Sequence, residues 1–230
     1  PAPYLRKEFN VTAPVRRAVV YATAQGFLEL HINGKRVGDE YFTPGWTDYR
    51  KRIYYRSYDV TSMLKKGSNA IGAILGDGWF RGNISLVGQN QYGKLLRLKA
   101  QLHIDYADGR SETIASDPSW KASFGPILGS DMQAGETYDA RLETTGWARA
   151  GFDEDGWNSV DSGSDIDPVI QAYPGVPVRK TMERRTVKVS EPTPGAYVFD
   201  LGQNFSGWIR LKVRGNAGDE VVMRFGEMLN

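Results

Sequence analysis

The sequence predicts an all-β protein built as a β-sandwich or jelly roll, and three observations lead to this fold class. Short segments that alternate apolar and polar side chains recur along the chain, with turn residues between them at close spacing. Aromatic residues make up 12% of the 230 residues and glycine occurs 26 times, a combination typical of strands joined by turns. No long amphipathic helical pattern is present, so we expect no helix longer than about three turns.

The early part of the chain predicts two strands and a hairpin. Residues 15–24 form the first expected strand. Residues 27–33 alternate strictly, which predicts a half-buried strand with His31 on its solvent-facing side. Asn33-Gly34 is the strongest short signal for a hairpin turn, so residues 35–37 should begin the return strand.

The stretch Tyr41–Tyr58, YFTPGWTDYRKRIYYRSY, is rich in aromatic and basic residues. Pro44-Gly45 predicts a turn that places Trp46 and Asp48 on a loop, before an aromatic strand at residues 52–58. An aromatic ring beside a carboxylate and guanidinium groups can hold a sugar, because the ring stacks on C–H surface while the charged groups bind hydroxyls. The alternative, which this stretch alone favours, is a core Trp beside a solvated basic strand face, since aromatics are common in β cores.

The rest of the chain continues the pattern of short strands and turns. Residues 59–67 predict one short helical turn, which an Asp can cap and a Gly can end. Residues 76–79 predict a tight turn that presents Trp79, and residues 135–157 are expected to form aromatic loops. Further strands are expected at Asn69–Leu75, Leu96–Tyr106, Ser111–Ala115, Arg185–Val189, Tyr197–Leu201, Trp208–Val213 and Glu220–Phe225.

Composition excludes several classes of function. The net charge of +2 is too balanced to indicate binding to nucleic acid or to an anionic membrane surface. The chain has no Cys and two His, which excludes disulfides, Cys-ligated zinc and multi-His metal sites. No apolar run approaches the ~18–20 residues that span a bilayer. Cysteine usage gives no information on the compartment; a periplasmic or secreted location is expected rather than a cytoplasmic one.

The sequence singles out no catalytic machinery. Glycoside hydrolysis needs two placed carboxylates, and nothing in the spacing of the acidic residues selects a pair. No Gly-x-Ser-x-Gly elbow, phosphate-binding loop or His-based metal motif is present. A calcium site is chemically reasonable, because calcium accepts carboxylate, amide and backbone carbonyl oxygens from irregular loops. Asp48 and Asn90 with neighbouring carbonyls would suffice, although Asp and Asn at turns are more often turn formers only.

Five long motifs follow one another in a fixed order: LHINGKRVGDEYFTPGWTDYRKRIYYRSYDVTSML, GDGWFRG, LLRLKAQLHIDYADGRSETIASDPSWKAS, GETYDAR and GWARAGFDEDGW. Together they resemble the N-terminal domain of bacterial α-L-rhamnosidases. The tail, VFDLGQNFSGWIRLKVRGNAGDEVVMRFGEML, looks like the next module of the same enzymes. The resemblance implies a jelly-roll β-sandwich akin to carbohydrate-binding modules over residues 1–165. It also implies the beginning of a second, truncated β-sandwich over residues 174–230.

In this family the acid and base carboxylates lie on a later (α/α)₆ barrel. The resemblance therefore implies that this chain is a non-catalytic fragment, and no catalytic residue is carried over to it. The implied partners are L-rhamnose or rhamnose-containing glycans and the missing barrel of the same polypeptide, with no nucleic acid and no membrane.

In some members of the family the first module binds L-rhamnose through a calcium ion. Tyr49 stands where binding members have Asn, which removes a side-chain oxygen, and Leu96 stands where many relatives have Pro. The resemblance places the calcium ligands on Asp48, the carbonyl of Tyr49, Asn90 and a backbone oxygen near Leu95 or Leu96. It places the carbohydrate-binding groups on Trp79, Trp46, Arg81 and Asp48.

Three functions remain open on the sequence. The first is carbohydrate binding within a rhamnosidase, and the second is a purely structural domain that packs against the missing barrel. In the second case Trp46 and Trp79 would be core residues and Asp48 a turn former. The third, an independent hydrolase, requires an acid/base pair that nothing here singles out. Solvent exposure of the two Trp side chains separates the first two.

Overall fold

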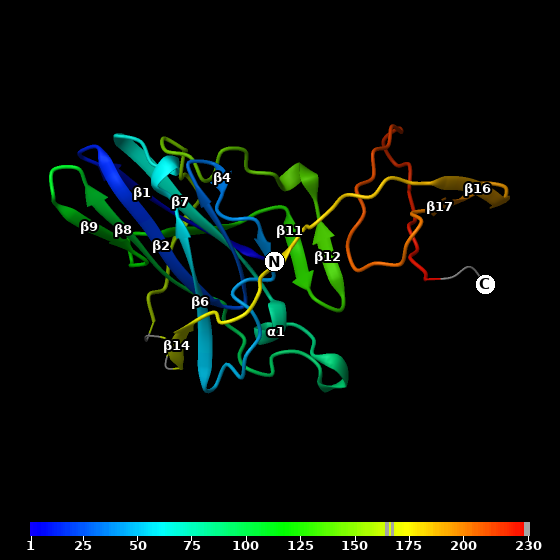
Figure 1. The fold of residues 1–230 in the computed structure, drawn as a ribbon, viewed down its shortest axis with the longest axis horizontal. Coiled ribbons are helices and arrows are strands. Elements are labelled where there is room, and N and C mark those ends of the chain that lie inside the picture. The colour runs from blue at the N-terminus through cyan, green and yellow to red at the C-terminus, as the bar shows by residue number, and fades with distance from the viewer. Residues whose placement is uncertain (164–165, 167, 228–230) are drawn as a thin grey trace. The chain divides into compact units, whose positions relative to one another are not determined.

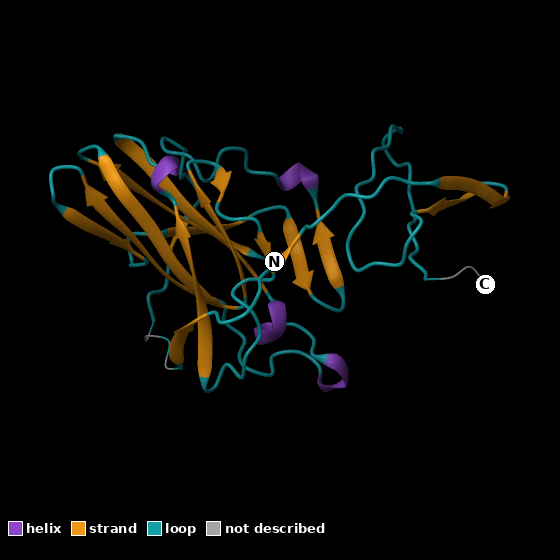
Figure 2. Ribbon diagram, in the orientation of Figure 1, coloured by secondary structure: helices purple, strands orange, loops and turns teal. Residues whose placement is uncertain are grey.

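The computed structural model describes residues 1–163, 166 and 168–227, and the chain divides into two compact units (Figure 1). Unit 1 is Pro1–Arg179 and unit 2 is Lys180–Asn230; each is described separately. Strands dominate (Figure 2), and the longest described helix, α1 (Gly78–Arg81), has four residues, so the all-β prediction is confirmed. No helix among these residues has the length and apolarity needed to cross a membrane. Three 3₁₀ turns are η1 (Thr61–Met63), η2 (Ser85–Val87) and η3 (Ala140–Leu142).

Unit 1 contains two large sheets. The first has six strands in the order β13-β10-β1-β7-β3-β4. Their bounds are β1 (Pro3–Val11), β3 (Phe27–Ile32), β4 (Lys35–Arg36), β7 (Gly67–Gly76), β10 (Lys121–Phe124) and β13 (Asn158–Ser159). The second has five strands in the order β14-β6-β2-β8-β9. Their bounds are β2 (Val15–Gln25), β6 (Arg52–Asp59), β8 (Arg97–Tyr106), β9 (Ser111–Ala115) and β14 (Val169–Ala172).

Two smaller strand pairs flank these sheets. Strand β11 (Ile127–Asp131) pairs with β12 (Gly135–Tyr138), and β5 (Glu40–Tyr41) pairs with β15 (Val178–Arg179). The segment 135–157 was expected to form loops only, so strand β12 is a correction. It forms because β11 supplies an antiparallel partner that local sequence patterns do not reveal.

One apolar core joins the two large sheets. Val20 on β2 and Leu102 on β8 belong to the same buried cluster as Ile71 on β7. The alternation predicted for residues 96–106 is present on β8, where Leu102 and Ile104 are buried while Gln101 and His103 are exposed. Two sheets that share an inner core form a β-sandwich, as the sequence predicts; its jelly-roll connectivity stays a prediction.

The predicted hairpin at Asn33-Gly34 is also confirmed. The φ angles of these residues are 51° and 78°, and positive values at both positions fit the tight hairpin turn that joins β3 to β4. The prediction for His31 needs correction. Its side chain is only 16% exposed, its Nε2 lies 2.9 Å from Oε1 of Glu29, and its ring lies 5.2 Å from that of Trp147. Trp147 covers it from a distant loop that strand alternation cannot reveal.

Strand β1 lies between β10 and β7, although no strand was predicted before residue 15. Arg6 lies opposite Gly72 on β7, on the face away from the core residues Phe9 and Val11, yet its side chain is fully buried. Because β1 is thus buried on both faces and carries a charge on one of them, it shows no simple apolar alternation. The Arg6 guanidinium donates to the carbonyls of Trp147 (2.7 Å) and Arg149 (2.9 Å). It also forms ion pairs with Glu8 and Glu154, so Arg6 fastens this loop segment to β1.

Residues 169–179, which we call the clasp, close one edge of the sandwich. Strand β14 lies parallel to β6, and β15 lies antiparallel to β5. The sequence places the boundary between the modules at residues 165–174, whereas the clasp lies within unit 1.

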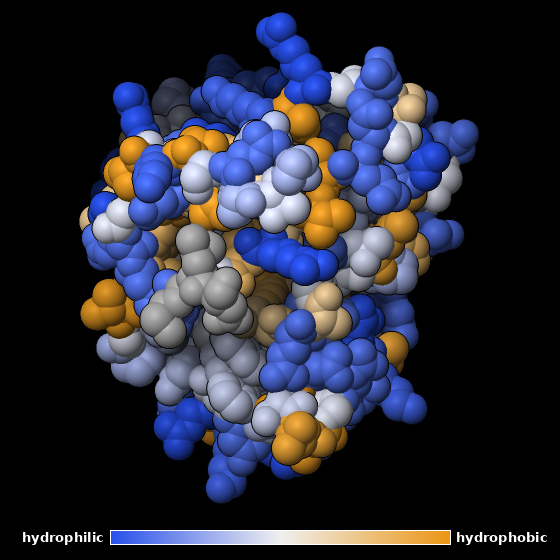
Figure 3. Space-filling view, turned by 90° about the vertical axis from the view of Figure 1, so that its right-hand side faces the viewer, coloured by the Kyte–Doolittle hydropathy of each residue, from blue (hydrophilic) through white to orange (hydrophobic). Residues whose placement is uncertain are grey.

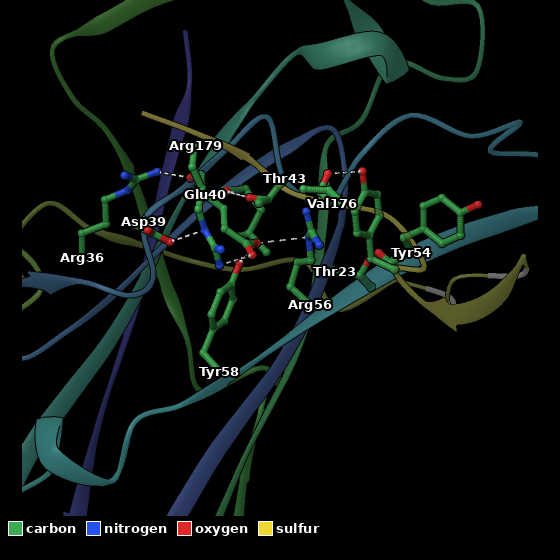
Figure 4. Close-up of polar contacts among 12 residues, drawn as sticks. Thr23, Arg36, Asp39, Glu40, Thr43, Tyr54, Arg56, Tyr58, Val176 and Arg179 are labelled. Atoms are coloured by element: carbon green, nitrogen blue, oxygen red, sulfur yellow. Dashed lines mark hydrogen bonds and ion pairs between the residues drawn. The ribbon is translucent and has the colours of Figure 1, made fainter. Parts of the chain in front are cut away.

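A nearly buried carboxylate, Glu40, lies where the clasp meets the sandwich (Figure 4). It forms ion pairs with Arg56 and Arg179, both at 3.3 Å, and accepts a 3.0 Å hydrogen bond from the Tyr58 hydroxyl. Burial, with the charge of Glu40, raises the pKa of Tyr58 above its usual range, so the phenol stays a donor. The clasp is therefore held by charges as well as by strand pairing.

Unit 2 contains one described hairpin, β16 (Lys188–Thr193) paired with β17 (Ala196–Asp200). The strands predicted at 208–213 and 220–225 are wrong, because both segments lack strand structure. A strand needs a neighbour for its backbone hydrogen bonds, and no residue described between 180 and 227 is buried. Figure 3 shows exposed apolar groups among hydrophilic ones. By their exposed fractions, the exposed apolar side chains of unit 2 include Val189, Phe199, Phe205, Trp208, Leu211, Val222 and Phe225.

Candidate functional site

Two tryptophans that the sequence singles out lie against each other. Their ring centroids are 5.6 Å apart and the ring planes differ by 5°, so the indoles of Trp46 and Trp79 are stacked. Trp46 follows the turn at Gly45, and its side chain is 49% exposed. Trp79 lies on α1 and is partly buried. Neither is a core residue of the sandwich, so one indole supports the other at the surface.

Two phenylalanines extend this pair, and the sequence analysis missed both. The ring of Phe27 lies edge-on to Trp79 at 5.1 Å, and the ring of Phe42 lies 6.5 Å from Trp79. Phe42 is 42% exposed and has a φ of 57°, a left-handed conformation that bulky residues rarely adopt. Its place in the aromatic stretch 41–58 was the available signal. We call Phe27, Phe42, Trp46 and Trp79 the aromatic platform.

The turn that carries Trp79 is fixed by charged contacts. Arg81 Nε donates a 2.7 Å hydrogen bond to Oδ1 of Asp77, so the guanidinium folds back on its own turn. The backbone N–H of Asp77 donates to Ser130 near the end of strand β11. Arg81, predicted to contact sugar, therefore has a positioning partner on the protein.

Asp131 anchors the other end of the same turn. Its Oδ2 accepts from the Asn83 backbone at 2.6 Å, and its Oδ1 accepts from the backbones of Gln133 (2.7 Å) and Ala134 (2.8 Å). Burial alone would raise the pKa of Asp131, but these N–H donors outweigh it and lower the pKa. The ionised carboxylate therefore joins the segment after α1 to the β11–β12 turn.

Asp48 is exposed and forms a turn. Its Oδ1 accepts from the Arg50 backbone at 3.2 Å, and its carbonyl accepts from the backbones of Lys51 (2.9 Å) and Arg52 (3.1 Å). The ammonium of Lys51 lies 3.9 Å from Oδ2. These contacts fit the turn-forming role that the sequence left open.

Tyr49 points inward beside this turn. It is 3% exposed, and its ring packs edge-on against Phe80 at 5.4 Å and near Tyr92 at 5.1 Å. Burial raises the pKa of the Tyr49 phenol above its usual range, and its hydroxyl donates to the Gly45 carbonyl at 3.2 Å. Leu96 packs against the same buried cluster and also against the main core. Both side chains are therefore packing groups.

Asn90 lies on a loop that adjoins the Asp48 turn. Its φ is 63°, and its backbone N–H donates to the Arg81 carbonyl at 2.9 Å. The guanidinium of Arg50 donates to the carbonyl of Gln91 at 2.8 Å. The structure thus brings the loops of Asp48, Trp79 and Asn90 together at one region of unit 1.

The fit of this region to calcium depends on its donors. Among the described residues there is no group of three or more His, Cys, Asp or Glu side chains that could hold a metal. Asp48 supplies the one carboxylate of the predicted set, and one of its oxygens and its own carbonyl already accept backbone N–H groups. The nearby Lys51 cation also opposes a bound metal. The donor set fits calcium poorly as it stands, and the calcium site stays a prediction.

Comparison with curated proteins finds α-L-rhamnosidases as similar sequences. The chain is 49% identical over 228 residues to an α-L-rhamnosidase of Streptomyces avermitilis, and 34% identical over 230 residues to one of Alteromonas sp.. The alignments cover 98% and 99% of this chain but 22% and 25% of the relatives. The chain thus spans about a quarter or less of the length of the curated relatives it matches.

Solved structures give the same result. The crystal structure of the S. avermitilis α-L-rhamnosidase complexed with L-rhamnose matches with a TM-score of 0.84 at 49% identity, covering 88% of this chain and 20% of that one. Native α-L-rhamnosidase from Aspergillus terreus matches with a TM-score of 0.80 at 40% identity, covering 88% and 24%. The sandwich described above is therefore shared with these enzymes.

Two family models match separate parts of the chain. The bacterial α-L-rhamnosidase concanavalin-like domain matches residues 190–230. The α-L-rhamnosidase N-terminal domain matches residues 13–182, which include the core, the aromatic platform and the clasp. This protein belongs to the family of α-L-rhamnosidase N-terminal domains.

Proposed function

We propose that this chain is a non-catalytic part of an α-L-rhamnosidase and that its aromatic platform binds L-rhamnose or a rhamnose-containing glycan. Hydrolysis of terminal L-rhamnose would belong to a longer polypeptide, because the chain spans only 22% of its S. avermitilis relative. The observation that carries sugar binding is the stacked pair Trp46–Trp79 with Trp46 half exposed.

The chemistry of this pair suits a sugar. One indole face of Trp46 rests on Trp79, and an apolar sugar face can stack on its free surface. Phe42, exposed and held at positive φ, widens the surface. Strained aromatic residues at a surface are a signal of function. A monosaccharide has about 11 heavy atoms, so at about 0.3 kcal/mol per atom we expect millimolar affinity.

A second function is favoured by other contacts in the same region. Arg81 is paired with Asp77, and Asp48 serves its own turn, so both predicted polar groups have internal roles. An exposed aromatic platform without free polar groups would suit packing against another part of a longer polypeptide. Under this alternative the unit is a structural support and binds no sugar.

Calorimetry separates the two. L-rhamnose is titrated into the 230-residue chain with calcium and with a chelator, and into the variant Trp46→Ala. Sugar binding predicts a binding heat with a dissociation constant in the millimolar range, which the variant abolishes. A dependence of this heat on calcium would support the metal site. Trp208→Ala, which removes an exposed indole of unit 2, is the matched control and should change nothing. Absence of heat from the folded chain under both conditions would favour the structural alternative.

A further inference from the structure

A hollow lies on unit 1, on the outer face of the five-stranded sheet. Its volume is about 270 Å³, just below the range of about 300–1,000 Å³ typical of small-molecule sites. None of its lining residues belongs to the aromatic platform. They are Tyr21, Ala22, Thr23, Tyr55, Lys99, Ala100, Gln101 and Ile170.

Strand register explains why these side chains meet. On the ladder between β2 and β8, Tyr21 lies opposite Gln101 and Thr23 lies opposite Lys99. All four lie on the face opposite to the core residues Ala22 and Ala100. Two more lining residues complete the hollow, Tyr55 on β6 and Ile170 on β14. The site is thus built on four adjacent strands, which hold side chains more firmly than loops do.

The two tyrosines form the apolar wall of this hollow. The rings of Tyr21 and Tyr55 are 6.1 Å apart at an interplanar angle of 62°, so they present two differently oriented surfaces. Tyr21 is 40% exposed. Thr23 donates its hydroxyl to the carbonyl of Tyr54 at 2.6 Å, so it forms a satisfied floor. The hollow therefore offers aromatic surface beside a hydrogen-bonded floor.

An amide beside the tyrosines gives the hollow its polar chemistry. Gln101, directly across the ladder from Tyr21, is exposed and carries both amide donors and an acceptor. Aromatic rings beside an amide match a pyranose, which combines apolar C–H faces with hydroxyls that donate and accept. The space is suited to one ring and is too small for a folded segment of protein.

We propose that this groove binds one pyranose unit of a glycan, as a site separate from the aromatic platform. It would give the unit two points of attachment to a branched or extended glycan, and two weak sites on one chain raise overall avidity. The inference depends on residues of β2, β6 and β8 only, so it stands or fails independently of the function proposed for the platform.

The test is a titration of the uniformly ¹⁵N-labelled 230-residue chain, followed by amide chemical shifts. The probes are methyl α-L-rhamnopyranoside and methyl β-D-glucopyranoside, taken to about 0.1 M because millimolar affinity is expected. Binding predicts saturable shifts at the amides around residues 21, 55 and 101. Tyr21→Ala and Gln101→Ala should each raise the dissociation constant fitted to these shifts by about tenfold. Neither variant should change the shifts at the platform.

Two controls make the outcome decisive. His103→Ala changes the same face of β8 two residues from Gln101 and should leave the groove shifts intact. Trp46→Ala should abolish platform shifts and preserve groove shifts. No saturable groove shift with either sugar, or groove shifts that survive both groove variants, would overturn the inference. Saturable groove shifts without any platform shifts in the unmodified chain would contradict the proposed function and not this inference.

Discussion

The guanidinium carbon of Arg56 lies 3.6 Å from the centre of the Tyr173 ring, which links the sandwich to the clasp. Tyr173 also packs edge-on against Tyr54 at 5.4 Å. A Cβ added at Gly45 would lie 2.9 Å from the Tyr173 ring, so this tyrosine fills the space beside the turn that precedes Trp46. The clasp thus packs against the turn that carries Trp46 of the aromatic platform.

Removing the Tyr173 ring should therefore affect both stability and the platform. We expect Tyr173→Ala to lower the free energy of unfolding by about 2 kcal/mol, because a cation–π contact and partly buried ring packing are lost. Tyr173→Phe keeps the ring and should stay within about 0.5 kcal/mol of the parent. Urea denaturation measures both. Equal stability of the alanine variant and the parent would show that the Tyr173 ring does not stabilise the unit.

The same contact predicts a strict requirement at Gly45. Its φ is 114°, which side chains rarely adopt, and there is no room for a Cβ. Gly45→Ala should cost about 1–3 kcal/mol and weaken any binding at Trp46. Gly218→Ala shares the positive φ but meets open space, so it isolates the backbone effect from the clash with Tyr173. Equal costs at the two positions would contradict the role given to Tyr173.

Arg6 should be the most sensitive charged residue of unit 1. Its guanidinium is fully buried with carbonyl and carboxylate partners. Arg6→Ala leaves these acceptors unpaired, and breaking buried pairs costs about 3–5 kcal/mol. Arg16→Ala, which removes a 70% exposed side chain, should change stability by less than about 1 kcal/mol. Thermal unfolding of the two variants compares them directly, and similar melting temperatures would refute the prediction.

Acid should loosen the turn that carries Trp79. The folded-state pKa of Asp131 is lowered, so its contribution to stability is complete above the unfolded value near 3.8. That contribution is lost as the pH falls through the folded-state pKa. Asp131→Asn should therefore be less stable than the parent at neutral pH, and the difference should shrink as the pH falls below about 4. A difference that stays constant from neutral to acidic pH would show that the charge is not responsible.

Local patterns predicted the strands that carry one buried and one exposed face. Strand β8 and the Asn33-Gly34 hairpin follow directly from alternation and from a residue pair that favours positive φ. Strand β1 was not predicted because it is buried on both faces: Phe9 and Val11 face the core, and the charged Arg6 is buried on the opposite face, so no simple alternation results. The prediction for the tail was wrong in the opposite way. The apolar residues at 208–213 have a strand-like pattern, but the segment has no neighbouring strand to pair with among the described residues and forms no strand.

The candidate site was predictable in its residue types and only partly in its geometry. The stretch 41–58 and the turn at 76–79 identified Trp46 and Trp79, but their stacking depends on two segments about thirty residues apart in sequence. Phe27 joins from a third element, and the pairing of Arg81 with Asp77 removes a group expected to meet sugar. Such long-range contacts leave no periodic signal in a single sequence.

The two indoles of the platform should respond differently to truncation. Trp46 is half exposed and rests on Trp79, so Trp46→Ala should cost less than about 1 kcal/mol of stability and remove binding of L-rhamnose. Trp79 contacts Trp46, Phe27 and Phe42, so Trp79→Ala should cost about 3 kcal/mol and lose binding as well.

Asp48→Ala completes the comparison by testing the metal. If calcium bridges the sugar, this variant loses calcium and sugar binding together; if Asp48 only forms its turn, sugar binding survives and stability falls by about 1 kcal/mol. Calorimetry for binding and urea unfolding for stability, on the three variants, distinguish these cases. Retained L-rhamnose binding in folded Trp46→Ala would remove the platform from the proposed function, because no other group in the region offers a half-exposed indole face to a sugar.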